Sequence, residues 1–213
     1  MTILKFTKAD MLNSTLVTPE TGAPVFTILT RSHFIRANGR DSDTESEDED
    51  SATQRTIITN KTGRTVAEIA WKGRQPVEVV IGKEKINVKG MFGTKSAILS
   101  QNVVGLPTRF DPELFWLAAP SGLSLLDYES SQTRGQYHVN AIRVGDKLRA
   151  APIAGFGNDY LEFDSHPDAP TEEFIVSFIL VETMRRGRFN LNPHKPWTEN
   201  LASIGRKIRR SSV

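Results

Sequence analysis

The sequence predicts a mainly β protein, a closed or nearly closed antiparallel β-barrel that encloses one hydrophobic helix near the C-terminus. Two observations predict this fold class. Residues 53–163 consist of short segments in which apolar and polar residues alternate, separated by Gly, Pro, Asn and Asp. Residues 174–181 are then almost wholly apolar, with glutamates before them and arginines after them. Because a helix that is apolar all round must be enclosed, the preceding strands are expected to surround it.

The N-terminal part predicts two strands, at residues 3–6 and 24–30, with turn residues between them. The following residues 37–52 show no apolar periodicity and carry seven acidic side chains between Asp41 and Asp50. Such a segment buries too little apolar surface to offset the entropy lost on ordering. The sequence therefore predicts a disordered acidic loop between two strands.

The clearest strand patterns lie in residues 53–88. Ala67, Ile69 and Trp71 fall on one face of a predicted strand, and Val77, Val79 and Ile81 do so in the next. Polar residues on the alternate positions are typical of an antiparallel sheet with one solvated face. Further strand cores are expected at residues 84–89, 115–117, 123–125, 139–143 and 161–163, for a total of about nine to eleven strands.

A helix is predicted over residues 171–187. Two glutamates follow Pro170 at the positive end of the helix dipole, two arginines lie at the negative end, and Gly187 is suited to end the helix. Several β-branched residues leave a long central strand as the alternative. Charge polarity and length favour the helix, and the fold prediction requires that Ile175, Phe178 and Ile179 be shielded from water.

We expect a single domain at residues 1–187, followed by a basic, flexible tail at residues 188–213. Four apolar residues of the tail, Trp197, Leu201, Ile204 and Ile208, have the spacing of an amphipathic helix. Such a helix can lie on an anionic membrane surface, dock on its own domain or remain disordered. The sequence leaves these three outcomes open.

The composition excludes several classes of chemistry. The chain has no cysteine, which rules out disulfides, thiolate catalysis and thiol-rich zinc sites. The N-terminus does not resemble a signal peptide. The longest apolar run is far shorter than the ~20 residues that span a bilayer. The expected location is the cytoplasm, with the membrane periphery or the nucleus as alternatives, and no transmembrane segment is expected.

The sequence predicts no catalytic residues, no bound metal and no cofactor. Asp164, His166 and Asp168 could in principle gather a metal ion, but a polar turn before a helix explains the same residues. Four aromatic residues, Trp71, Trp116, Phe110 and Phe115, could offer a stacking platform for bases or sugars, but each lies within an apolar run, which favours core positions.

Several short patterns together resemble an uncharacterised domain family that is abundant in mushroom-forming fungi. They lie at residues 55–58, 67–71, 109–110, 115–116, 173–182 and 185–186. That family resembles the tubby-like and phospholipid-scramblase barrels, so the resemblance implies a closed antiparallel sheet around a C-terminal helix, over roughly residues 3–186. It implies no activity, because the fungal family has no assigned reaction. Tubby-like members bind phosphoinositides through a basic surface cluster.

The leading functional hypothesis is a non-enzymatic intracellular domain that binds an anionic phospholipid or a membrane surface. The candidate contacts are basic residues of one stretch and of the tail: Lys83, Lys85, Lys89, Lys95, Arg206, Lys207, Arg209 and Arg210. A solvated sheet face and a disordered tail explain the same residues. Nucleic acid is not the expected ligand.

Two alternatives belong to other functional classes. The first is a module that binds a protein partner, with the acidic loop and the basic tail as regulatory arms. The second is an enzyme with a carboxylate site in the barrel mouth, for which Glu113, Glu129 and Glu162 are candidates. A barrel interior filled by the helix would leave little room for a substrate.

Overall fold

The computed structural model describes residues 1–33, 53–92, 97–100 and 102–191. The acidic loop predicted at residues 37–52 lies outside the described residues. So does the basic tail from residue 192 onwards, including its candidate amphipathic helix. The described residues form a β-sheet and one long helix near the C-terminus.

The strands and helices are short except for a few long strands and the last helix. The described strands are β1 (Thr2–Phe6), β2 (Thr15–Val17), β3 (Pro24–His33), β4 (Thr53–Asn60), β5 (Thr65–Lys72), β6 (Gln75–Ile81), β7 (Glu84–Ile86), β8 (Ala97–Ser100), β9 (Val103–Pro107), β10 (Leu114–Ala119), β11 (Gly122–Asp127), β12 (Thr133–Val144), β13 (Lys147–Ala150) and β14 (Asn158–Phe163). The helical segments are a 3₁₀ turn η1 (Met11–Asn13), α1 (Val88–Met91) and α2 (Thr171–Phe189).

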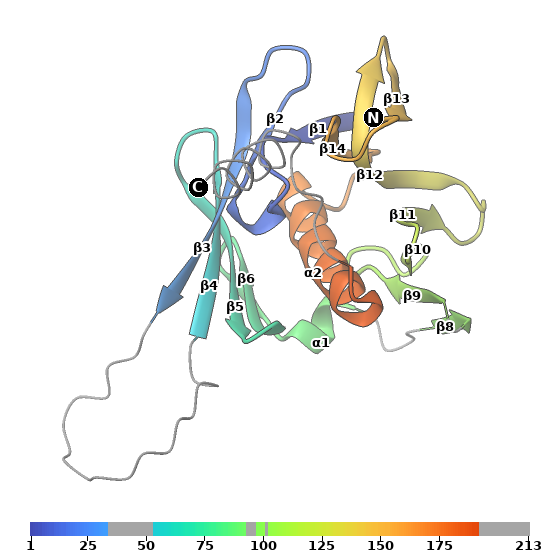
Figure 1. Cartoon of the computed structure of the whole chain (residues 1–213). Coiled ribbons are helices and arrows are strands. Elements are labelled where there is room, and N and C mark those ends of the chain that lie inside the picture. The colour runs from blue at the N-terminus through green and yellow to red at the C-terminus, as the bar shows by residue number, and fades with distance from the viewer. Residues whose placement is uncertain (34–52, 93–96, 101, 192–213) are drawn as a thin grey trace, which may run out of the picture.

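All fourteen described strands belong to one sheet, and every pairing in it is antiparallel. Thirteen strands follow the order β7-β6-β5-β4-β3-β2-β1-β14-β12-β11-β10-β9-β8, and β13 pairs with β12. Hairpins therefore build two halves of the sheet, and β14 joins them by pairing with β1 and with β12. Figure 1 shows the two halves on opposite sides of α2.

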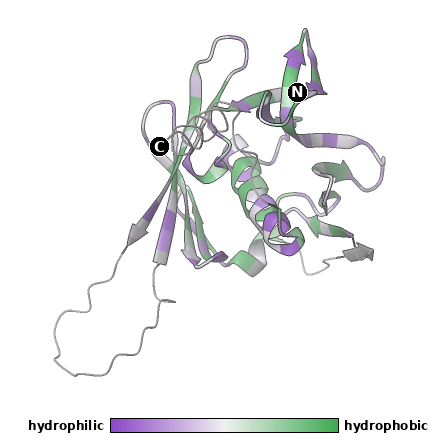
Figure 2. Cartoon of the chain, in the orientation of Figure 1, coloured by the Kyte–Doolittle hydropathy of each residue, from purple (hydrophilic) through white to green (hydrophobic). Residues whose placement is uncertain are grey.

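Helix α2 is enclosed by the sheet, which confirms the prediction on which the fold class depended. Every residue from 174 to 181 is at most 2% exposed. The Phe178 ring lies 4.9–6.2 Å, between centroids, from the rings of Phe6, Trp116 and Tyr137. These three aromatic residues come from β1, β10 and β12, so both halves of the sheet contact the helix. Figure 2 shows that the hydrophobic part of α2 gives way to a hydrophilic C-terminal end.

The predicted closure of the barrel is not confirmed. Strands β7 and β8 end the hydrogen-bonded order, and no pairing joins them among the described residues. Helix α1 follows β7 instead of a continuing strand, and an isolated bridge links Phe92 to Thr108. Beside it, Arg109 contacts Glu84 of β7 at 2.8 Å. The sheet curls around α2. At the seam between its two end strands, β7 and β8, side-chain contacts and one isolated bridge take the place of strand pairing.

The ends of α2 carry the predicted charges, but the helix does not end at the predicted residue. Glu172 and Glu173 lie in the first turn, and Arg186 and Arg188 lie in the last. Gly187 lies within the helix, and Asn190 ends it with a left-handed conformation at φ 53° and ψ 39°. Asparagine tolerates this region better than most residues, which suits Asn190 to end the helix.

Some predicted strand positions are also wrong. The chain forms more strands than nine to eleven, because several of them have three or four residues, too few for a visible alternation. Val88 lies in α1 and not in a strand. Val77 is 52% exposed although it was expected to share a buried face with Val79. The β5–β6 register shifts at this point, and a bulge turns the bulged residue away from the regular alternation.

Both candidate stacking tryptophans are core residues, as their apolar surroundings favoured. The indole N–H of Trp116 donates to the Ser177 hydroxyl of α2 at 2.8 Å, and Trp71 donates to Thr56 at 2.8 Å. Trp116 and Ser177 are both buried. This buried hydrogen bond helps to fix how α2 packs against β10.

We predict that Ser177→Ala destabilises the fold by about 1–3 kcal/mol, because it leaves the buried indole N–H of Trp116 without an acceptor. Denaturant unfolding followed by circular dichroism measures this change in the free energy of unfolding. Ser121→Ala, which alters an exposed serine, is the matched control and should leave the stability within about 0.5 kcal/mol. Equal stability of the two variants would contradict the assigned role of the hydroxyl.

Candidate functional site

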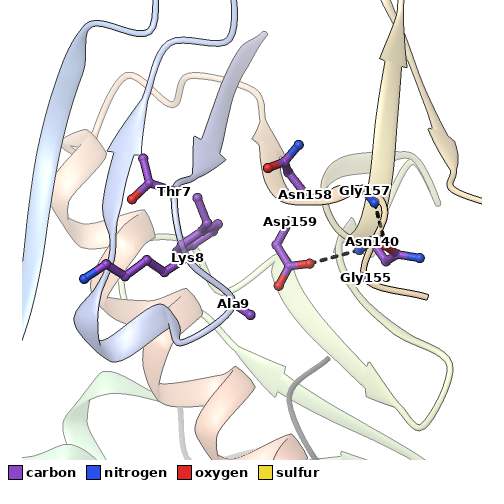
Figure 3. A pocket seen from close by; sticks show the side chains of 9 residues that line it. Thr7, Lys8, Ala9, Asn140, Gly155, Gly157, Asn158 and Asp159 are labelled. Carbon is purple, nitrogen blue, oxygen red and sulfur yellow. Dashed lines mark hydrogen bonds between the residues drawn. The ribbon is translucent and has the colours of Figure 1, made fainter. Parts of the chain in front are cut away.

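A small pocket lies between the turn after β1, the interior of β12 and the start of β14. It has a volume of about 100 Å³ and is lined by Phe6, Thr7, Lys8, Ala9, Asn140, Gly155, Gly157, Asn158 and Asp159. Figure 3 shows the Lys8 side chain extending away from Asp159. A water molecule occupies ~30 Å³ of liquid, and sites for small organic ligands measure about 300–1,000 Å³. This pocket therefore has room for a few waters but not for a metabolite.

Asn140 organises one wall of the pocket by holding the loop between β13 and β14. Its side-chain amide donates to the carbonyl of Ile153 at 2.9 Å and accepts from the N–H of Gly157 at 2.8 Å. Its backbone carbonyl accepts from Ala151 at 2.8 Å. Asn140 has φ +50°, at the point where the β12–β14 register shifts. One residue in a left-handed conformation thus fastens the loop at three points.

Asp159 forms the acidic part of the pocket, and both of its carboxylate oxygens are engaged. One oxygen accepts from the backbone N–H of Asn140 at 2.9 Å, and the other accepts from the Tyr137 hydroxyl at 2.7 Å. Figure 3 shows the bond to Asn140 and the neighbouring bond to Gly157. Burial raises the pKa of Tyr137 well above its ordinary value, and the charge of Asp159 adds to this effect. Tyr137 therefore remains a hydrogen-bond donor at neutral pH.

The polar contacts continue from the pocket to the C-terminal end of α2. The Tyr137 hydroxyl accepts from Arg186 at 3.2 Å, and Arg186 donates to Glu182 at 2.7 Å. Arg185 binds both carboxylate oxygens of the fully buried Glu182 and donates to the carbonyl of Ala119 at 2.9 Å. Each charge is thus paired, as buried charges require. This network fastens α2 to β12 and to the β10–β11 turn.

Another polar cluster lies at the N-terminal end of α2. Arg109 donates to Glu173 at 2.9 Å as well as to Glu84, and the hydrogen bond to Glu173 is the main cause of its raised pKa. His166 contacts Asp111 at 3.1 Å through one ring nitrogen and accepts the backbone N–H of Asp168 at 3.2 Å on the other. Both ring nitrogens of His166 therefore have a hydrogen-bonding partner.

The residues considered for metal binding or for carboxylate chemistry do not converge. No group of three potential metal-ligating side chains comes together within the described residues. Glu162 contacts His138 at 2.7 Å, whereas Glu113 and Glu129 are exposed beyond the ends of β10 and β11. None of the three carboxylates lines the pocket.

The structure brings together only part of the predicted basic cluster. Lys83 is exposed in the turn between β6 and β7, and the Lys85 ammonium lies 2.5 Å from Glu78. Glu84 lies between the two lysines in the chain but pairs with Arg109. Lys89 lies in α1. The remaining candidates lie outside the described residues: Lys95, Arg206, Lys207, Arg209 and Arg210.

Asn140 and Asp159 were not predicted as site residues from the sequence. An asparagine within an alternating strand looks like an ordinary solvent-facing position, and its positive φ leaves no trace in the pattern. The two glycines that flank Phe156 could have indicated a close backbone contact in this loop. Gly157 has no space for a side chain, because an added Cβ would lie 2.5 Å from the carbonyl carbon of Asn140.

Comparisons with known proteins give one distant likeness. No family model matches the chain, and no curated protein sequence matches it. The fold is similar to an X-ray structure of an Arabidopsis thaliana protein, with 11% sequence identity and a TM-score of 0.31. The match covers 84% of this chain and 89% of that chain. A likeness this distant supports no statement about function.

The length and composition of the helices can be compared with what a membrane span requires. Among the described residues, none of them is both long enough and apolar enough to cross a membrane. The buried helix α2 carries Glu173, Glu182 and Arg185 within its length. Its apolar residues are used to fill the core.

We predict that Gly157→Ala destabilises the protein by about 1–3 kcal/mol, because the new Cβ would overlap the backbone of Asn140 and Ala141. Thermal and denaturant unfolding measure the loss. Gly122→Ala is the matched control, since an added Cβ there would meet no atom within 4 Å. If the two alanine variants were equally stable, the close approach of the loop to Asn140 would be refuted.

Proposed function

We propose that this chain is a non-enzymatic binding domain whose ligand is an anionic phospholipid surface. The observation that carries the proposal is the filled interior. Ile175, Phe178 and Ile179 are fully buried within the sheet, and the pocket at Asn140 measures about 100 Å³. A domain with so little internal space recognises its ligand on its exterior, and a bilayer is a ligand that requires no cavity.

The charge of the exterior supports an anionic ligand. The whole chain has a formal net charge of +2, with 27 basic and 25 acidic residues. Among the described residues, exposed cations without an ion pair include Lys8, Lys83, Lys147 and Arg149. Each basic residue held near an anionic bilayer contributes about 1 kcal/mol of attraction, which salt screens. Several such residues together give measurable binding.

We propose in addition that the architecture is tubby-like. An antiparallel sheet wrapped around a C-terminal hydrophobic helix supports this assignment. The seam between β7 and β8 is the feature that differs from a closed barrel. The assignment concerns the fold and adds no activity to the domain.

A protein partner is the second candidate, because one strand offers an edge. Within the described part of the chain, β13 pairs with β12 and with no other strand. An edge of this kind can add a strand from another chain. An enzyme with a carboxylate site receives no support, since the oxygens of Asp159 and Glu182 are engaged in structural contacts.

The proposed function predicts salt-sensitive binding of the full chain to phosphatidylcholine vesicles that contain phosphatidylserine. Binding should decrease as the ionic strength rises from about 0.1 M to about 1 M, because the screening length falls from ~10 Å to ~3 Å. Vesicle co-sedimentation measures the bound fraction, and vesicles of phosphatidylcholine alone are the control. Equal binding to both vesicle types, or binding to neither, would exclude an anionic lipid surface as the ligand.

A further inference from the structure

Exposed apolar side chains gather on one segment of the chain. Val144, Ile153 and Phe156 are 54%, 51% and 62% exposed. All three belong to residues 141–157, which comprise the end of β12, strand β13 and the loop before β14, and which we call the hairpin–loop surface. The hairpin of β12 and β13 stands away from α2 in Figure 1. Several large apolar side chains that remain exposed within one segment of the chain indicate an interaction surface.

The loop presents Ile153 and Phe156 from a fixed backbone. Asn140 binds this loop at Ala151, Ile153 and Gly157. In addition, the N–H of Phe156 donates to the carbonyl of Ile153 at 3.2 Å. A flexible loop could fold its apolar side chains onto the protein, whereas this clamped loop holds them in water. The structure therefore maintains an arrangement that is unfavourable unless a ligand covers it.

Two cations accompany the apolar side chains on the hairpin. Ile142 pairs with Arg149, and Val144 pairs with Lys147. Cross-strand partners and residues two apart share one face of a hairpin, so both cations lie on the same face as Ile142 and Val144. Lys147 and Arg149 are exposed, and no ion pair engages either of them within the described residues.

Acidic groups do not cancel this positive charge. Asp146 is the only acidic residue between positions 141 and 157, and it lies 3.7 Å from Arg143. Arg143 is also bound to Glu20, so that arginine is already neutralised. The β6–β7 hairpin differs, because Glu78 pairs with Lys85.

We propose that the hairpin–loop surface is the part of this protein that docks on an anionic phospholipid bilayer. Phe156 and Ile153 enter the boundary between headgroups and acyl chains, and Lys147 and Arg149 contact lipid phosphates. The inference rests on the proposed function and names the surface that carries it out. Rigidly held apolar groups in the same segment as unpaired cations suit a bilayer interface, which accepts apolar side chains and attracts positive charge.

The first experiment uses the absence of cysteine in the chain. A Phe156→Cys variant carries one environment-sensitive nitrobenzoxadiazole (NBD) probe at the loop, and Tyr128→Cys carries the same probe at another exposed aromatic position, in the turn after β11. With phosphatidylserine-containing vesicles, the probe at position 156 should shift to the blue and lose quenching by aqueous iodide. The probe at position 128 should show neither change, and phosphatidylcholine vesicles should affect neither probe.

The second experiment measures affinity by co-sedimentation. The double variant Lys147→Glu/Arg149→Glu should bind at least about 25-fold more weakly, which corresponds to about fivefold for each cation. Ile153→Ser/Phe156→Ser should also lose binding. The matched control Lys83→Glu/Lys85→Glu makes the same charge change on the β6–β7 hairpin and should retain binding. Circular dichroism and thermal unfolding confirm that all variants are folded.

The outcomes separate this inference from the proposed function. If the wild-type chain binds anionic vesicles while the probe at position 156 does not respond, the docking surface lies elsewhere and the inference is overturned. Loss of binding only in the Lys83/Lys85 variant would overturn it in the same way. If the wild-type chain binds no vesicles, the proposed function fails and the inference with it. A probe response to rising protein concentration without lipid would instead identify a second copy as the occupant.

Discussion

The enclosure of one apolar helix is the constraint on which the rest of this structure depends. Burial of a large aliphatic or aromatic side chain contributes about 1.5–3 kcal/mol, and residues 174–181 hold seven such side chains around Ser177. A helix of this kind has no solvent-facing side. The sheet must therefore reach it from opposite directions, which β14 makes possible by joining the two hairpin-built halves.

Polar side chains of α2 are hydrogen-bonded in the middle of the helix and near both of its ends. Ser177 meets Trp116 in the middle, Glu173 meets Arg109 at one end, and Glu182 meets two arginines at the other. These contacts leave few polar atoms available for chemistry inside the fold. Under the proposed function, recognition takes place on the exterior, where the hairpin–loop surface combines apolar and cationic groups.

Much of the fold could be predicted from the sequence, because its main features are periodic. The buried face of Ala67, Ile69 and Trp71 and the all-round apolar run at residues 174–181 follow directly from pattern and burial. Closure could not be predicted, since it requires a pairing between the two end strands, β7 and β8, and alternation within a strand does not show which strands pair. Val77 was misplaced because a bulge of one residue reverses the alternation without any change in composition.

The candidate site was harder to predict for a different reason. Lysines are visible in a sequence, but their acidic partners across a hairpin, such as Glu78 beside Lys85, are not. The clamp made by Asn140 depends on a backbone angle and on contacts 11 to 17 residues away along the chain. The exposure of Ile153 and Phe156 becomes evident only when the core is known to be complete without them.

Hydrogen exchange of the α2 amides tests the central claim most directly. If the sheet encloses the helix, the amides of residues 175–182 exchange only through global unfolding, and their protection equals the free energy of unfolding measured with denaturant. They would then be as protected as the central strands β4 and β5. Exchange of these amides at rates well above those of the two strands would show that α2 leaves the sheet without unfolding, which would contradict the enclosure of the helix as the basis of this fold.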